Sequence, residues 1–161
     1  MNIFLDKHQA FLIDLINDEV SFILVGGYAV IYHGYVRATG DMDIWLKPDN
    51  ENKEKLLSVL EKHGFSKESI KQVRKLDFKE MVAFHFGYPP EKIDFLTKLA
   101  GINFEESHSH SETLKLKGFN IPVLQLNDLI INKLLSGRAK DKADIEELQK
   151  IQKLKKKMMR K

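Results

Sequence analysis

One short segment, Phe22-Ile23-Leu24-Val25, does most to limit how this chain can fold. Four consecutive apolar residues, rich in β-formers and followed at once by Gly26-Gly27, are typical of a buried strand that ends in a turn. A buried strand needs an apolar interior around it. The 161 residues, of which 43% are hydrophobic and 30% charged, supply one compact core with a polar surface. We therefore expect a single domain over residues 1–161 and exclude disordered and fibrous classes.

Helices and strands are mixed on either side of this segment. Apolar residues at helical spacing and glycine stops predict helices over residues 4–16, 28–33, 50–63, 126–135 and 140–158. Runs of β-formers predict further strands over residues 41–46, 81–86, 92–96, 114–117 and 121–123. Gly87-Tyr88-Pro89-Pro90 is expected to join two of these strands in a hairpin. The prediction is an α+β fold with a small mixed β-sheet flanked by helices, a core over about 20–125 and a C-terminal helical segment over about 126–158.

The composition excludes several kinds of site. The chain has no cysteine, which excludes disulfides, iron–sulfur clusters, thiolate zinc sites and cysteine nucleophiles.

No segment has the length needed to cross a bilayer, and the first residues lack the features of a secretory signal. We therefore expect a cytoplasmic protein without a membrane partner.

The net charge of +3 conceals an uneven distribution. Residues 150–161 carry seven basic residues and no acidic one, so the rest of the chain is mildly acidic. Such a tail can hold nucleic-acid phosphates. A solvated helix end, whose lysines suit the C-terminal end of the helix dipole, is the interpretation that we favour.

Three aspartates stand at positions where strands are expected. Asp41 and Asp43 are two residues apart in one strand, so their side chains point to the same side of the sheet. Two neighbouring carboxylates repel each other unless a cation lies between them, and oxygen ligands favour magnesium or manganese. A pair at a loop end facing water is the alternative. Asp94 is a third acid and lies between apolar neighbours. The alternative to a functional role is a structural one, in which its carboxylate bonds to backbone amides or pairs with Arg74 or Lys92.

The two glycines after the first strand indicate a close backbone approach. Gly26-Gly27 lies between a buried strand and a short helix, where bare amides can contact an anionic oxygen. A plain tight turn is the alternative. Neither a dinucleotide fingerprint nor a Walker motif follows, so those two classes of nucleotide site are unsupported.

These motifs together resemble the polymerase-beta-like nucleotidyltransferase superfamily. The similarity rests on three stretches in order: Val25-Gly26-Gly27-Tyr28-Ala29, Arg37-Ala38-Thr39-Gly40-Asp41-Met42-Asp43-Ile44 and Ile93-Asp94-Phe95-Leu96. The chain looks closest to the small bacterial branch that contains minimal nucleotidyltransferases and abortive-infection toxins. Residues 128–145 also resemble the helical end of that branch.

The resemblance implies an enzyme that moves a nucleoside monophosphate group from a nucleoside triphosphate such as ATP to an acceptor hydroxyl. Asp41, Asp43 and Asp94 would be the catalytic metal ligands for Mg²⁺ or Mn²⁺, and Asp94 would also receive the acceptor proton. Gly26 and Gly27 would hold the triphosphate. Many members carry serine where this chain has Tyr28, and the toxin-like branch often has a bulky residue there.

Further residues of the resembling segments are candidates for nucleotide binding. Arg37 and Thr39 would contact phosphate or merely pack the loop before the acids.

A lysine falls on the apolar face of the helix expected over 126–135. That face is defined by Leu126, Leu129, Ile130 and Leu134, and Lys133 lies seven residues after the first of them. Lys133 would either extend along the core to water or bind a triphosphate or a carboxylate of the metal site.

Other polar residues have plainer interpretations. Asp141 and Asp144, with Arg138 and Lys140 nearby, favour an ion-pair network that docks the last helix. His85 is expected to be a bonded residue at the edge of the core.

The acceptor is not identified by the sequence, and RNA, a protein or a small molecule are all open. The alternatives to transfer are a catalytically quiet nucleotide- or RNA-binding module and the toxin half of a toxin–antitoxin pair. Three acids at these positions argue against the quiet module, because folding alone does not require them. Because the chain lacks a large extra domain that would hold tRNA or an antibiotic, a partner subunit would supply acceptor specificity. An antitoxin is the partner that the toxin alternative implies. The His-Ser-His segment at 108–110 is expected to be an exposed loop and not a zinc site.

Overall fold

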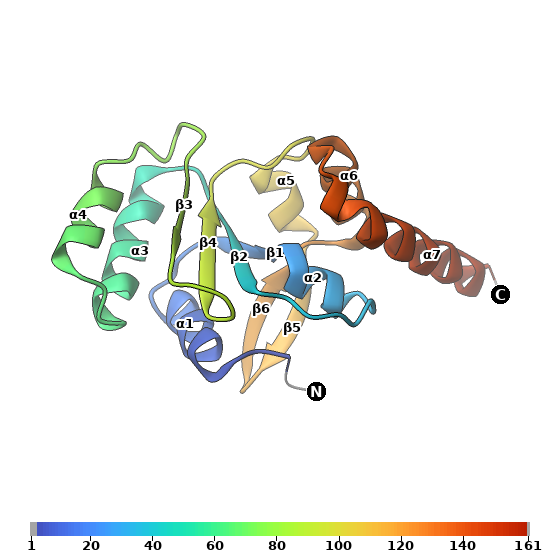
Figure 1. Ribbon diagram of the computed structural model, residues 1–161, viewed down its shortest axis with the longest axis horizontal. Coiled ribbons are helices and arrows are strands. Elements are labelled where there is room, and N and C mark those ends of the chain that lie inside the picture. Colours follow the sequence, from blue (N-terminus) through green and yellow to red (C-terminus); the bar gives the residue numbers. More distant parts are fainter. Residues whose placement is uncertain (1–2, 161) are drawn as a thin grey trace.

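A six-stranded mixed sheet forms the centre of the molecule in the computed structural model, which describes residues 3–160 (Figure 1). The strands lie in the order β3-β4-β2-β1-β6-β5. Their bounds are β1 (Phe22–Val25), β2 (Asp41–Leu46), β3 (Ala83–Phe86), β4 (Lys92–Leu96), β5 (Glu112–Leu116) and β6 (Phe119–Val123). β2 pairs in parallel with β4, and β1 with β6, whereas the other three pairings are antiparallel. The predicted α+β class with a mixed sheet is therefore confirmed.

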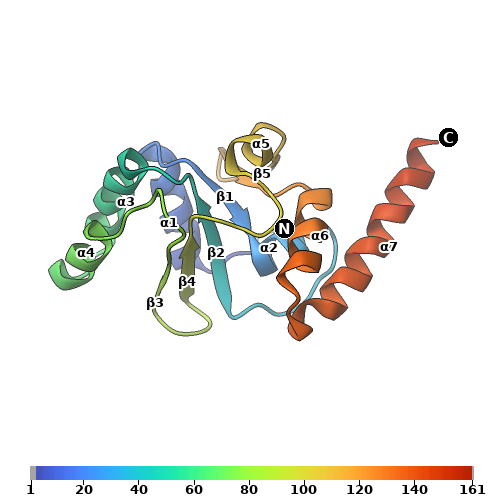
Figure 2. The same ribbon diagram turned by 90° about the horizontal axis from the view of Figure 1, so that it is seen from above.

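Seven α-helices surround this sheet within residues 3–160. They are α1 (Asp6–Asn17), α2 (Gly26–Tyr32), α3 (Asn50–Lys62), α4 (Lys67–Arg74), α5 (Phe104–Ser109), α6 (Leu126–Ser136) and α7 (Lys142–Met159), with a 3₁₀ turn, η1 (Ala139–Asp141), between the last two. Helices α1, α3 and α4 lie together at one end of the molecule, and α6 and α7 lie at the other (Figures 1 and 2). The last turns of α7 extend away from the sheet (Figure 2). None of the helices in this part of the chain has the length and apolar character to span a membrane.

The burial of β1 and β2 explains why the sheet is built around them. All four residues of β1 are buried, as its uninterrupted apolar run predicts. In β2, Met42 and Ile44 are buried on one face, whereas Asp41 and Asp43 on the opposite face are only half-buried. One face of β2 therefore joins the apolar core, and the other carries its two acids toward a cavity.

Two short helices were absent from the expectations based on sequence. Helix α4 buries only Val73, so it lacks the apolar spacing that would reveal a helix. Helix α5 includes His108 and Ser109, so the loop expected at 108–110 is wrong, whereas the expected exposure of these residues is confirmed. The sequence signals for these helices are their N-terminal capping residues, Ser66 and Asn103. The side chain of each accepts a hydrogen bond from the backbone amide three residues later.

Candidate active site

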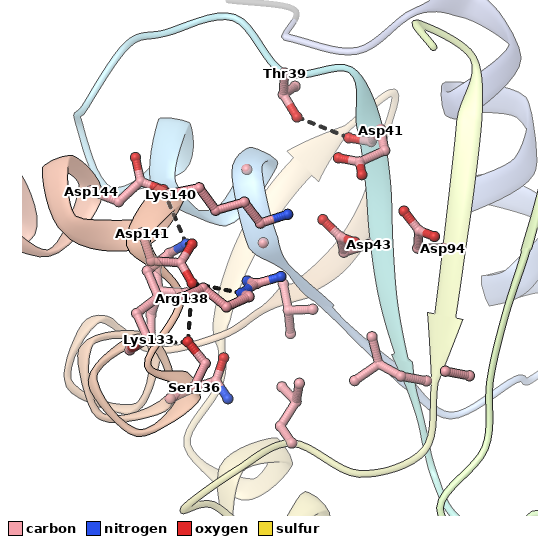
Figure 3. Close-up of a pocket in the computed structure, with 18 of the residues that line it drawn as sticks. Thr39, Asp41, Asp43, Asp94, Lys133, Ser136, Arg138, Lys140, Asp141 and Asp144 are labelled. Atoms are coloured by element: carbon pink, nitrogen blue, oxygen red, sulfur yellow. Dashed lines mark hydrogen bonds and ion pairs between the residues drawn. The ribbon is translucent and has the colours of Figure 1, made fainter. Parts of the chain in front are cut away.

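A cavity of about 890 Å³ lies between the sheet and the C-terminal helices. Its lining comes from the ends of β1 and β2, from β3 and β4, and from α6, η1 and the start of α7. Figure 3 shows Asp41, Asp43 and Asp94 on the sheet side of this cavity. The labelled basic side chains lie on the helical side, together with Asp141 and Asp144. The site is therefore built from segments that are distant in the sequence.

Three carboxylates meet on the sheet side of the cavity. Strands β2 and β4 run in parallel with Asp43 paired to Asp94, and Asp41 lies two residues before Asp43 on the same face. One oxygen atom from each of the three carboxylates lies within 4.8 Å of the others. Lys92 forms an ion pair with this cluster, with its Nζ 3.4 Å from Asp94 Oδ2. The expected convergence of the three acids is thus what the structure shows.

The environment of this cluster disfavours its full ionisation. Burial, followed by the charges of Asp41 and Asp94, raises the pKa of Asp43 to about 7. Burial and the neighbouring Asp41 also raise the pKa of Asp94. An all-oxygen donor set with unfavourable mutual repulsion is the chemistry that a divalent cation such as Mg²⁺ or Mn²⁺ prefers. The three residues fit a metal site of that kind.

The glycine turn stands directly against this cluster. Gly26 has φ +65°, and a Cβ atom on it would overlap the carboxylate of Asp43. A Cβ atom on Gly27 would overlap the hydroxyl of Thr39, which itself donates a 3.0 Å hydrogen bond to the carbonyl of Asp41. Both glycines line the cavity. They are therefore needed for close approach and not only for the turn.

Tyr28, the third residue of this turn, has its side chain in the core and not among the residues that line the cavity. Its hydroxyl lies 3.1 Å from Nδ1 of His8 in α1, and its ring packs against Phe4 with 4.7 Å between the ring centroids. The bulky residue at this position thus contacts α1. Its expected role in nucleotide binding stays a prediction.

Lys133 lies at the centre of a buried ion-pair cluster on the helical side. Its Nζ is 3.0 Å from Asp141 Oδ1 and 3.0 Å from Asp144 Oδ2, and all three side chains are buried. Lys133 therefore lies on the inward face of α6, as expected, whereas Leu134, which was placed on that face, is 51% exposed. Its expected contact with a triphosphate stays a prediction.

Arg37 links the loop before β2 to the same cluster. Its Nε and Nη2 donate hydrogen bonds of 2.8 Å to the two carboxylate oxygens of Asp144. Burial alone would raise the pKa of Asp144. The hydrogen bonds from Arg37 and Lys133 outweigh it and hold this pKa below its ordinary value. The loop that carries Thr39 is thereby fastened to the start of α7. This is the docking network that was expected around Asp141 and Asp144, extended by Arg37.

Two basic residues of the cavity were not among the predicted site residues. Arg138 and Lys140 line the cavity, and Figure 3 shows both side chains directed from the helical side toward the acids. Arg138 Nε donates a 2.8 Å hydrogen bond to Asp141 Oδ2, whereas Lys140 forms no ion pair within the described residues 3–160. The sequence signal that could have revealed these two residues is the Arg-x-Lys pattern directly after Gly137. This glycine, with φ +66°, ends α6.

Comparisons with known proteins find a matching family and a solved structure with a similar fold. The family described as nucleotidyltransferase of unknown function (DUF6036) matches residues 3–161. Among solved structures, the lincosamide antibiotic adenylyltransferase LnuA, solved with lincomycin bound, has a similar fold with a TM-score of 0.56. The two sequences are 17% identical, and the match covers 93% of this chain and 99% of that one. A comparison with curated proteins found no match.

Proposed function

Because the chain belongs to the nucleotidyltransferase family described as DUF6036, we propose that it moves a nucleoside monophosphate group from a nucleoside triphosphate to an acceptor hydroxyl, with a divalent cation and within a single domain. The observation that carries this proposal is the meeting of Asp41, Asp43 and Asp94 against the glycine turn, in a cavity whose far side is basic. This arrangement has an anionic site for cations and a basic side for phosphates, which together suit phosphoryl chemistry.

The three aspartates would hold Mg²⁺ or Mn²⁺. When bound, such a cation neutralises the oxygens around the α-phosphorus and favours departure of pyrophosphate. The raised pKa of Asp43 supports this assignment, because a bound cation would relieve the cost of ionising that buried carboxylate.

The chain's own residues would divide the remaining work between the two sides of the cavity. On the helical side, Arg138 and Lys140 would bind the β- and γ-phosphates, and the backbone at Gly26 and Gly27 would contact phosphate oxygens without a Cβ in the way. Lys133, which is paired twice, would position this basic side by holding η1 and α7 against α6.

On the sheet side, the carboxylate of Asp94 would accept the proton of the acceptor hydroxyl. The acceptor oxygen forms a bond to the α-phosphorus, and the bond from that phosphorus to the bridging oxygen breaks. Pyrophosphate leaves with the electron pair of the broken bond. The position of Asp94 supports its assignment as the base, because its carboxylate belongs to the acid cluster and lines the cavity where the acceptor must enter.

The acceptor remains the open part of this proposal. The structural relative is an adenylyltransferase of lincosamide antibiotics, so a small hydroxyl-bearing molecule is the first candidate class. RNA and protein acceptors stay as predictions, and so does a role as the toxin of a toxin–antitoxin pair. Two observations favour transfer over the quiet binding module. The three acids lie close enough to share a cation, and within the described residues no hydrogen bond gives the Asp43 carboxylate a structural role.

The test is a transfer assay with each of the four α-labelled triphosphates and Mg²⁺ or Mn²⁺. Lincomycin, mixed tRNA and the protein itself serve as acceptors, and pyrophosphate release is measured in parallel. We expect one triphosphate to give metal-dependent pyrophosphate release that Asp43→Asn abolishes and that the exposed Glu61→Gln on α3 leaves intact. Nucleotide binding without pyrophosphate release for any triphosphate, metal and acceptor would favour the quiet module and contradict the proposal.

A further inference from the structure

A row of directly paired residues crosses the sheet at the floor of the cavity. Val25 pairs with Asp43, Asp43 with Asp94, and Asp94 with His85 on the edge strand β3. Directly paired residues on neighbouring strands project to the same face of a sheet. His85 therefore lies beside Asp94 on the face that carries the acids, and it is among the residues that line the cavity.

His85 has no structural partner that would explain its place. Its side chain is exposed, and within residues 3–160 the imidazole forms no hydrogen bond, ion pair or ring contact. The expectation of a bonded residue at the core edge was therefore wrong. The flanking Phe84 and Phe86 hold β3 to the core instead, with ring centroids 5.0 and 6.1 Å from that of Phe95. The strand would keep its place without the imidazole.

The direction of the reaction decides what can lie beside His85. In an in-line displacement the acceptor approaches the phosphorus from the side opposite the leaving pyrophosphate. The proposed phosphate-binding residues come from the glycine turn after β1 and from η1, whereas β3 lies beyond β4, on the other side of Asp94 in the strand order. The acceptor must therefore reach Asp94 over the β3 edge.

We propose that His85 is an acceptor-binding residue, whose imidazole forms a hydrogen bond with a polar group of the acceptor next to the reacting hydroxyl. The same side of the cavity includes Met81, which is 73% exposed, and Lys98. An acceptor that fits this side has apolar surface for Met81 and polar groups for the imidazole and the lysine. This inference rests on the proposed function and adds the acceptor side of the same site.

Chemical labelling tests the proposal without knowledge of the natural acceptor. Diethyl pyrocarbonate modifies accessible imidazoles, and trypsin releases residues 80–92 as a peptide whose one histidine is His85. His108 and His110 fall in another peptide, 99–115, and serve as an internal control outside the cavity. The probe is an ATP analogue with a methylene group between the α- and β-phosphorus atoms, added with Mg²⁺.

We expect the bound analogue to leave the labelling rate of His85 unchanged, because the nucleotide covers the opposite side of the acids. Binding is verified by the rise in Tm that the analogue causes. If the analogue binds and protects His85 while the control peptide is unaffected, His85 belongs to the nucleotide side and the inference is overturned. If none of the four triphosphates or the analogue binds, the proposed function itself fails.

Kinetics of variants provide the second readout. For whichever of lincomycin, tRNA or the protein itself accepts the label, His85→Ala should raise the acceptor KM about tenfold and leave the triphosphate KM unchanged. His85→Gln, which retains hydrogen-bonding atoms, should recover part of the loss. The matched control is His110→Gln, at an exposed histidine paired with Asp128. Equal changes in both KM values, or an unchanged acceptor KM, would refute an acceptor contact.

Discussion

Replacing Asp43 with asparagine should stabilise the metal-free protein at neutral and alkaline pH while it abolishes transfer. The carboxylate is half-buried next to two other acids, and no hydrogen bond to it is found within residues 3–160, so asparagine removes a charge without removing a bond. The shape of the side chain is retained. The variant therefore isolates the cost of the charge.

The size of the effect follows from the pKa of Asp43. A carboxyl whose pKa rises from 3.8 in the unfolded chain to about 7 in the folded protein opposes folding when it is ionised. Its unfavourable contribution is absent below the unfolded pKa, grows as the pH rises, and is complete above pH 7. The full difference is about 4 kcal/mol, because a tenfold change in acidity corresponds to about 1.4 kcal/mol. In a chain of this length that is a difference in Tm of roughly 10 °C.

The assay is urea unfolding of the wild type, Asp43→Asn and the Glu61→Gln control, with a chelator, at several pH values between about 4 and 8. The wild type should lose free energy of unfolding relative to Asp43→Asn as the pH rises, and the control should follow the wild type. Added Mg²⁺ should narrow the difference in free energy of unfolding, because the proposed metal site would bind it with three carboxylates in the wild type and with two in the variant. A difference between wild type and Asp43→Asn that does not vary with pH, or a less stable asparagine variant at pH 8, would refute the account of a strained acidic cluster.

Three more predictions follow from the glycine turn and the basic side of the cavity. Lys133→Ala should lower the free energy of unfolding by about 3 kcal/mol, because it leaves two buried aspartates with one cation fewer; a loss below 1 kcal/mol in urea unfolding would contradict this. Lys140→Ala should raise the triphosphate KM about tenfold in the pyrophosphate assay, whereas Lys142→Ala, at an exposed position outside the cavity, should leave it unchanged. Gly26→Ala should abolish transfer and destabilise the fold by more than Gly64→Ala, since both glycines have positive φ but only the first would place a Cβ against a carboxylate; equal Tm losses would show that only backbone strain matters.

The central strands could be predicted from the sequence almost to the residue. The strands at 22–25, 41–46 and 92–96 have the predicted bounds, because each contains a group of apolar β-formers and ends at a glycine, a proline or a polar turn. The α4 helix could not be found in the same way. It buries a single residue, Val73, and packs against α3, so the capping residue Ser66 is a stronger local signal for it than its apolar spacing.

One side of the candidate site could be predicted from the sequence and the other could not. The acids at 41, 43 and 94 and the glycine turn were predictable, because their chemistry is unusual for strand positions and their order resembles a known superfamily, a resemblance that the family match bears out. The basic side was not, because the approach of η1 to the sheet is a tertiary contact between segments about 100 residues apart. Spacing alone also could not show that the Tyr28 side chain turns toward α1 and away from the cavity.

The parallel pairing of β2 with β4 makes the geometry of the acids independent of the segment that connects them. Residues 47–91 contribute two helices and an edge strand, yet the distance between the carboxylates of Asp43 and Asp94 is set by how these two strands align. Homologues can therefore lengthen or shorten the connection before β3 without disturbing the acids. A slip of one residue between β2 and β4 would turn one carboxylate to the opposite face of the sheet and dismantle the site.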